Sequence, residues 1–162
     1  MTGEQPLDLR GEDALDLGRA LDFHILLRAI DQAMPADATL ALEGDAPAPV
    51  VRQFLLAHQA PDPRELVPNS DGTTLVFHLP LRDLGELRTL AEDCVSHEVA
   101  SHLMVYRGSE VLLWAHDAGD GSLLVAASLP PDTVRALGEA LGPTLRPHPR
   151  YRWFGLRRVR DE

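Results

Sequence analysis

Apolar residues follow two different periods along this chain. After Asp22 they recur at intervals of three and four residues until Pro35, a spacing typical of an amphipathic helix. Asp22 is a favourable residue for the N-cap of that helix. The same period, introduced by Asp or Pro, predicts three further helices over residues 47–60, 83–95 and 130–141.

Other segments alternate apolar and polar residues with a period of two, as strands do. They lie at 39–43, 73–79, 102–107, 110–116 and 123–128. The sequence therefore predicts an α+β fold. We expect a mixed sheet of about five strands, in which β-α-β-α units precede antiparallel hairpins and helices pack on the sheet.

The segment 102–116 predicts a β-hairpin that turns at Gly108-Ser109. A two-residue loop pairs Arg107 with Glu110, and this register puts His102 and His116 on opposite faces. Both faces of the hairpin are largely apolar. Either the chain covers both faces, or one apolar sheet face serves as an interface, for example in a homodimer.

The 162 residues predict one globular domain with two distinct ends. Residues 1–21 are polar with irregularly spaced leucines, and we expect them to be partly disordered or to form a short helix. The globular domain then spans 22–145. Residues 146–162 form a basic, aromatic tail, with six arginines against two acids, whereas residues 1–145 hold 23 acids and nine arginines.

Composition excludes several functional classes. Lysine is absent, so neither a P-loop nor Schiff-base chemistry on a lysine side chain is available. A single cysteine cannot form an internal disulfide, and no apolar run reaches the length of a membrane span. We expect a cytoplasmic protein. The net charge of −10 makes nucleic acid an unfavourable partner for the body of the chain.

The densest group of potential metal ligands lies between residues 94 and 117. Thiolate and imidazole groups suit zinc, and a candidate site uses Cys94, His97 and His116. Cys94 and His97 share a helix face only if the third helix continues through them. Cys94 also falls on the apolar stripe of that helix, where a buried, inert cysteine is common.

The tail combines arginines with aromatic residues, and we consider Arg150, Arg152, Trp153 and Arg157 as partner-binding residues. Such a segment can contact a protein, nucleic acid or an anionic membrane. It can also dock on its own acidic domain, because their charges are opposite.

No serine-nucleophile elbow and no dinucleotide-binding glycine motif occurs in the sequence. We therefore favour a non-catalytic binding protein that engages a macromolecular partner, most simply another protein, without a cofactor. The alternative is a metal-dependent or histidine-based enzyme with a site near residues 94–117. The two hypotheses differ in whether ligands from this segment converge.

Overall fold

A computed structural model describes residues 7, 9, 14–66, 75–117, 122–146, 151–154 and 157–160, the last two ranges by their backbone alone. The helices are α1 (Phe23–Ala33), α2 (Pro49–Ala57), α3 (Leu84–Leu90) and α4 (Pro131–Leu141), with 3₁₀ turns η2 (Leu81–Asp83), η3 (Ser96–Glu98) and η4 (Gly142–Thr144). The strands are β1 (Ala14–Ala20), β2 (Thr39–Gly44), β3 (Leu75–Pro80), β4 (His102–Arg107), β5 (Glu110–Ala115), β6 (Ser122–Ala126), β7 (Leu145–Arg146), β8 (Tyr151–Phe154) and β9 (Arg157–Arg160). Within these residues, no helix is long and apolar enough to cross a membrane.

The α+β class is confirmed, but the sheet is larger than expected. In the described part of the chain it has seven strands in the order β3-β2-β4-β5-β6-β1-β7, and every neighbouring pair is antiparallel. The prediction of about five strands in a mixed sheet is therefore wrong. Strands β8 and β9 form a separate two-stranded sheet in the tail, next to β1.

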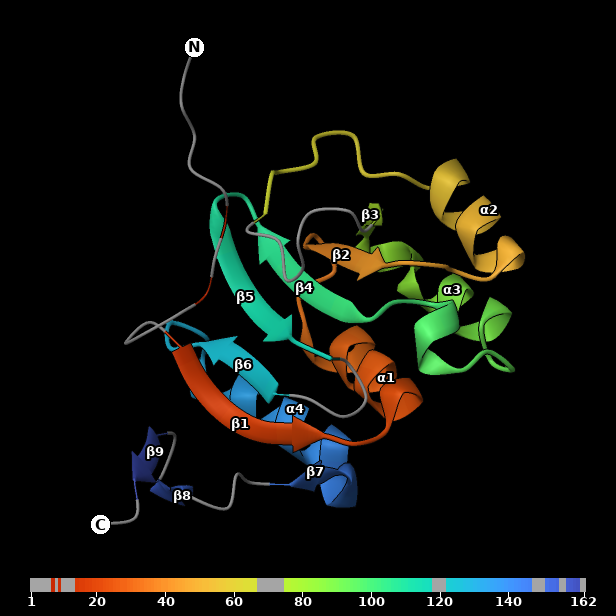
Figure 1. Ribbon diagram of the computed structural model, residues 1–162. Helices are drawn as coiled ribbons and strands as arrows, with labels where there is room; N and C mark the ends of the chain where they lie inside the picture. The colour runs from red at the N-terminus through yellow and green to blue at the C-terminus, as the bar shows by residue number, and fades with distance from the viewer. Residues whose placement is uncertain are drawn as a thin grey trace.

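The expected β-α-β units of adjacent parallel strands do not form, and the topology gives the reason. Helix α1 connects β1 to β2, α3 connects β3 to β4, and α4 connects β6 to β7. The two strands of each unit run parallel, but other strands of the sheet lie between them. Figure 1 shows α1 and α4 behind the sheet, and α1 contacts both α3 and α4. No helix of the described residues lies on the opposite face of the sheet, the helix-free face, which faces the viewer in Figure 1.

Helix α1 is built as the sequence predicts. The Asp22 carboxylate accepts a hydrogen bond from the Ile25 amide at 3.0 Å, which satisfies one free donor of the first turn. The helix buries its apolar stripe completely, including Leu26, Leu27 and Ile30. This stripe is the centre of the core between the helices and the sheet.

Residues 14–20, which we expected to be partly disordered or a short helix, form strand β1 between β6 and β7. Two leucines that precede it are also buried. Leu7 forms a parallel bridge with Leu66, and its amide donates to the carbonyl oxygen of Glu65 at 2.9 Å. Leu9 belongs to the same core. The segment before residue 22 is thus part of the domain wherever the structure describes it.

The hairpin of β4 and β5 has a different register from the one predicted. Arg107 pairs with Glu110 at the turn as expected, and Tyr106 pairs with Val111. The next pair is Val105 with Leu113, so Leu112 is an extra residue in β5. A one-residue bulge moves every later side chain to the other face. His116 therefore lies on the same face as His102, and the prediction that they point to opposite faces is wrong.

Candidate functional site

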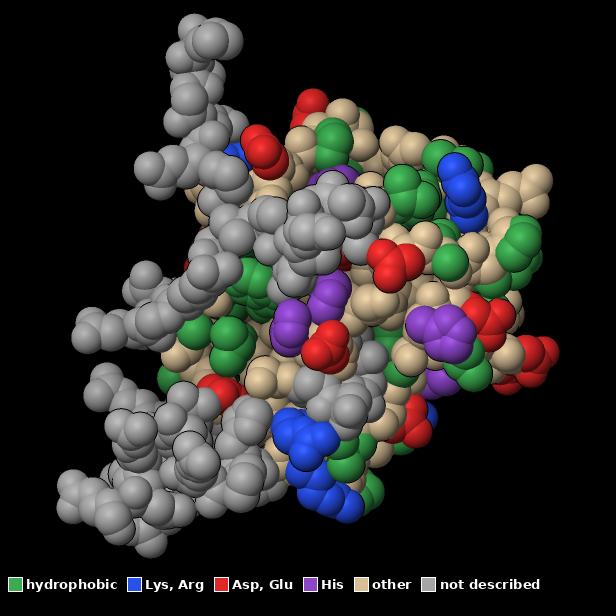
Figure 2. All heavy atoms as spheres, viewed as in Figure 1, with side chains coloured by type: hydrophobic (Ala, Val, Ile, Leu, Met, Phe, Trp, Pro, Cys, Tyr) green, Lys and Arg blue, Asp and Glu red, His purple; other side chains and the backbone are tan. Residues whose placement is uncertain are grey.

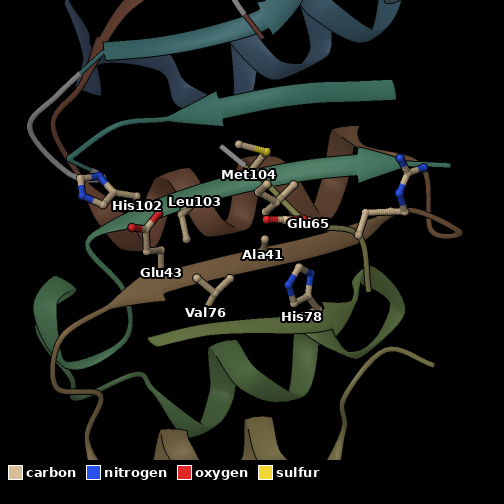
Figure 3. A pocket seen from close by; sticks show the side chains of 10 residues that line it. Ala41, Glu43, Glu65, Val76, His78, His102, Leu103 and Met104 are labelled. Carbon is tan, nitrogen blue, oxygen red and sulfur yellow. The ribbon is translucent and has the colours of Figure 1, made fainter. Parts of the chain in front are cut away.

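A pocket of about 200 Å³ lies on the helix-free face, over strands β3, β2 and β4 (Figure 3). Glu43 on β2 pairs with Val76 on β3 and with His102 on β4, and residues paired across antiparallel strands share a face. The lining residues are Ala41, Glu43, Arg64, Glu65, Leu66, Val76, His78, His102, Leu103 and Met104. Figure 2 shows histidine and acidic side chains gathered near the centre of this face.

Glu43 is the most unusual residue of the pocket. It lies near the end of β2, the second strand from the edge of the sheet, and is only 6% exposed, although glutamate is rarely buried. Figure 3 shows its carboxylate beside the ring of His102. Burial lowers the pKa of His102, and the negative charge of Glu43 offsets only part of that lowering. The pocket therefore holds a carboxylate in a largely desolvated position.

Tyr106 connects three segments at the other end of the pocket. Its hydroxyl accepts a hydrogen bond from the Arg64 amide at 3.1 Å and lies 2.9 Å from Nδ1 of His78. Burial lowers the pKa of His78, so its ring is neutral near pH 7 and shares one hydrogen bond with the Tyr106 hydroxyl. The rings of His78 and Tyr106 meet edge-on, with centroids 5.8 Å apart.

The lowered pKa of His78 predicts that stability decreases in acid. Below the ordinary value of 6.5 the unfolded chain binds a proton that the folded chain does not, so the free energy of unfolding falls as the pH decreases from 6.5 through the folded pKa. One histidine contributes a slope of at most about 1.4 kcal/mol per pH unit. Urea denaturation of the wild type and of His78→Gln between pH 7.5 and 5 measures this slope of the free energy of unfolding against pH.

Glutamine at position 78 keeps a side-chain acceptor for the Tyr106 hydroxyl but does not titrate in this range. We expect the variant to show a shallower dependence of the free energy of unfolding on pH. An equal dependence in both proteins would mean that His78 does not lose proton affinity on folding.

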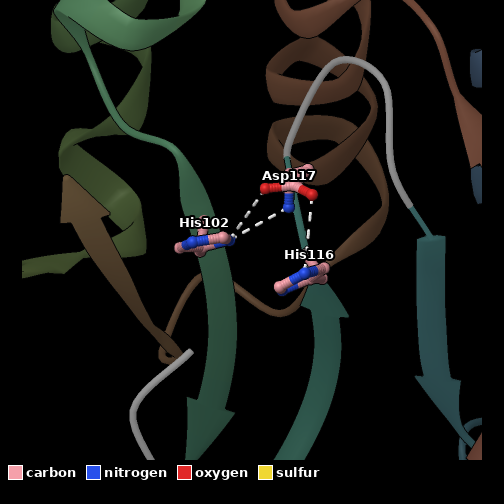
Figure 4. Close-up of side chains that lie close together, drawn as sticks. All are labelled: His102, His116 and Asp117. Carbon is pink, nitrogen blue, oxygen red and sulfur yellow. Dashed lines mark hydrogen bonds and ion pairs between the residues drawn. The ribbon is translucent and has the colours of Figure 1, made fainter. Parts of the chain in front are cut away.

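Two histidines and an aspartate meet at the end of the β4–β5 hairpin (Figure 4). The rings of His102 and His116 are stacked, with centroids 4.6 Å apart and an angle of 15° between their planes. One carboxylate oxygen of Asp117 is 3.8 Å from Nδ1 of His102, and the other is 3.5 Å from Nε2 of His116. Among the described residues, these three are the group whose ligand atoms could hold a metal ion, all within 4.8 Å of one another.

His102 is the fixed member of this group. Its side chain is largely buried, and its Nδ1 accepts a hydrogen bond from the Asp117 amide at 3.0 Å. Burial and the nearby His116 lower the pKa of His102 more than Glu43, Asp117 and Asp45 raise it. The neutral ring therefore carries its proton on Nε2. His116 and Asp117 are much more exposed and have room to move.

Cys94 and His97 lie apart from this group. Helix α3 ends at Leu90, four residues before Cys94, and His97 is in the short turn η3. The helix therefore does not continue through Cys94 and His97, which was the condition for them to share one of its faces. The carbonyl oxygen of Cys94 accepts a hydrogen bond from Nε2 of His24 at 2.7 Å. Burial, followed by the charges of Glu98 and Asp93, raises the pKa of the Cys94 thiol, which disfavours the thiolate that a metal requires.

The predicted partner-binding residues of the tail are placed only in part. Arg150 lies outside the described residues. Arg152 and Trp153 are on β8 and Arg157 is on β9, where the backbone alone is described. Their contribution to binding remains a prediction.

The ligands predicted from the sequence did not include His102 or Asp117, and the predicted sites did not include Glu43 or Tyr106. One feature of the sequence could have indicated Glu43. It is an acidic residue in the alternating segment 39–43, between Leu42 and Gly44. Tyr106 had none, because the partners of its hydroxyl come from β3 and from the connection after α2.

Comparisons with protein-family models, with curated proteins and with solved structures gave no match to this chain.

Proposed function

We propose that the chain is a non-catalytic binding protein that engages a protein partner through the pocket on the helix-free face. The observation that carries this proposal is the buried carboxylate of Glu43 in a pocket whose rim also holds Glu65. Ala41, Val76 and Met104 provide apolar walls. Such a pocket favours a group with an apolar stem and a cationic end.

The electrostatics of the pocket favour a basic side chain of the partner. His78 and His102 both have lowered pKa values and add no positive charge near pH 7. Arg64 also lines the pocket, but its guanidinium donates to the carbonyl oxygen of Gly108 at 3.4 Å, on the β4–β5 turn. The net charge of −10 attracts a basic protein and opposes the approach of nucleic acid.

The size of the pocket favours a side chain over a whole metabolite. Its volume is about 200 Å³, whereas sites for small organic molecules are typically about 300–1,000 Å³. A single arginine side chain on a protein surface fits this volume. We therefore propose that the partner inserts one arginine into the pocket.

The sequence suggests two further proposals for how the chain contacts a partner. The tail residues Arg150, Arg152, Trp153 and Arg157 are proposed to contact a partner, and β9 brings part of this tail next to β1. A homodimer through an apolar sheet face also remains a proposal. It is not needed to cover the hairpin, because Met104 and Trp114 on its helix-free face are already buried within one chain.

The pocket should bind N-acetyl-arginine amide and reject its neutral analogue, N-acetyl-citrulline amide. We expect the arginine compound to shift the amide resonances of Ala41, Leu66 and Val76 in a saturable way in two-dimensional NMR spectra. Citrulline has nearly the same shape without the charge, so its shifts should be much smaller. Equal shifts from both compounds would contradict a site for a cationic side chain.

A charge placed at the pocket rim provides the matched variant. Val76 is 42% exposed and lines the pocket, whereas Leu90 is 39% exposed on α3 and does not. We expect Val76→Arg to weaken binding of the arginine compound at least about ten-fold, because like charges then meet at the site. Leu90→Arg should bind as the wild type does. Unchanged binding by Val76→Arg would place the site elsewhere.

The alternative, a metal-dependent or histidine-based enzyme, also remains a proposal. It is favoured by the convergence of His102, His116 and Asp117 beside the same pocket, since His102 belongs to both. An imidazole near a carboxylate is the usual arrangement for general acid–base chemistry. This proposal requires turnover of a substrate, which the binding proposal does not.

A further inference from the structure

We propose that His102, His116 and Asp117 form a binding site for a divalent metal ion of the zinc type, with its remaining coordination position open to water. Two imidazoles and one carboxylate are an established ligand set for such ions, and three protein ligands leave a position for water or another ligand. The site does not depend on the binding function proposed above.

The distances fit an ion that draws the ligands slightly together. Zinc ligands at about 2.0–2.2 Å in tetrahedral geometry lie roughly 3.3–3.6 Å from one another. Oδ2 of Asp117 is already 3.5 Å from Nε2 of His116. Oδ1 of the same carboxylate is 3.8 Å from Nδ1 of His102. All three ligand atoms lie within 4.8 Å of one another. The histidine rings are the pair that must approach and turn.

Exposed members of the group can make this movement. His116 and Asp117 are largely exposed, whereas His102 is held by β4. Lone pairs of stacked, parallel rings do not meet at one point, so the exposed ring of His116 rotates toward His102 when the ion binds. Asp117 is at the first residue after β5, with a φ of +50°, in the turn that begins there.

Metal binding replaces one hydrogen bond of the metal-free state. Nδ1 of His102 accepts the Asp117 amide proton, and the ion competes for the same lone pair. The amide that is released belongs to an exposed residue and can bond to water. The resonance of the Asp117 amide should therefore shift strongly when the ion binds, which gives the proposal a direct spectroscopic signature.

Glu43 supports His102 from the opposite side. Metal-bound histidines usually have a carboxylate or carbonyl near the second ring nitrogen, which orients the ring and increases its basicity. The Glu43 carboxylate lies beside the His102 ring (Figure 3), and the two residues are paired across β2 and β4.

Isothermal titration of the full chain, first treated with a chelator, with ZnCl₂ tests the site. We expect one zinc ion per chain, with His116→Ala and Asp117→Ala each lowering the affinity by at least about ten-fold. Both residues are exposed, so these variants should remain folded. Tetrahedral cobalt absorption bands, lost in the same two variants, should accompany binding of CoCl₂ as a second probe.

The control variants are Cys94→Ser and His97→Ala, which remove the other candidate ligands of this region. Both should bind zinc as tightly as the wild type. Zinc binding weaker than about 0.1 mM in the wild type would overturn the proposal. Loss of binding in the Cys94 or His97 variant, with retention in Asp117→Ala, would overturn it in favour of the ligand set predicted from the sequence.

Discussion

Leu27→Ala should lower the free energy of unfolding by about 2–5 kcal/mol, the range for truncation of a fully buried leucine. Leu27 is 0% exposed in α1, and this helix contacts both α3 and α4 behind the sheet (Figure 1). Since domains are stable by only about 5–15 kcal/mol, this variant should approach the limit of folding. Urea denaturation followed by circular dichroism measures the change.

Leu21 provides the control for this prediction. It is the same residue type six positions earlier, but it is 41% exposed, and Leu21→Ala should change the stability by less than about 1 kcal/mol. Similar losses in the two variants would mean that α1 is not packed between the sheet and its helical neighbours.

The features of the helical layer that could be predicted depend on residues close in sequence. The N-cap at Asp22 and the apolar stripe of α1 are local properties, and both are confirmed. Strand β1 lacks such a signal. Its ladder is interrupted between Asp16 and Gly18, where Gly18 has a φ of +110° and donates its amide to the Asp16 carboxylate at 2.8 Å. This bulge breaks the alternation that would have revealed the strand.

The order of the strands could not be predicted for a different reason. Helices that connect strands favour parallel neighbours, and the sequence offers alternating helices and strands up to residue 95. Whether another strand inserts between the two strands that a helix connects depends on contacts between segments distant in sequence. Here β2 lies between β3 and β4, and β1 lies between β6 and β7.

The candidate metal site depends on the bulge at Leu112, which the sequence pattern does not predict. The turn at Gly108-Ser109 and the pair Arg107–Glu110 were predicted correctly, and these alone put His102 and His116 on opposite faces. The segment Val111–Trp114 is apolar throughout, so no alternation shows that Leu112 is an extra residue. The bulge decides that the two histidines share a face. Ligand types could be predicted, but not which of them converge.

Tyr106→Phe should destabilise the fold by about 1–3 kcal/mol, although it removes only one oxygen atom. The side chain is 2% exposed. Its hydroxyl bonds to the Arg64 amide and to Nδ1 of His78, so phenylalanine leaves both groups without this partner. Removing an oxygen that is bonded to two polar groups lowers the free energy of unfolding more than removing an ordinary exposed hydroxyl does. The midpoint of urea denaturation at pH 7.5 measures it.

The same substitution in a His78→Leu background separates the hydrogen bonds from simple packing. If the unsatisfied Nδ1 of His78 accounts for part of the loss, Tyr106→Phe should be less destabilising when the histidine is absent, by about 0.5 kcal/mol or more. An equal loss in both backgrounds would show that the hydroxyl does not couple to His78. A smaller loss in the His78→Leu background would show that the hydroxyl holds β3, β4 and residue 64 together at the pocket. The pocket walls would then loosen in Tyr106→Phe, and binding of N-acetyl-arginine amide should weaken in parallel with stability.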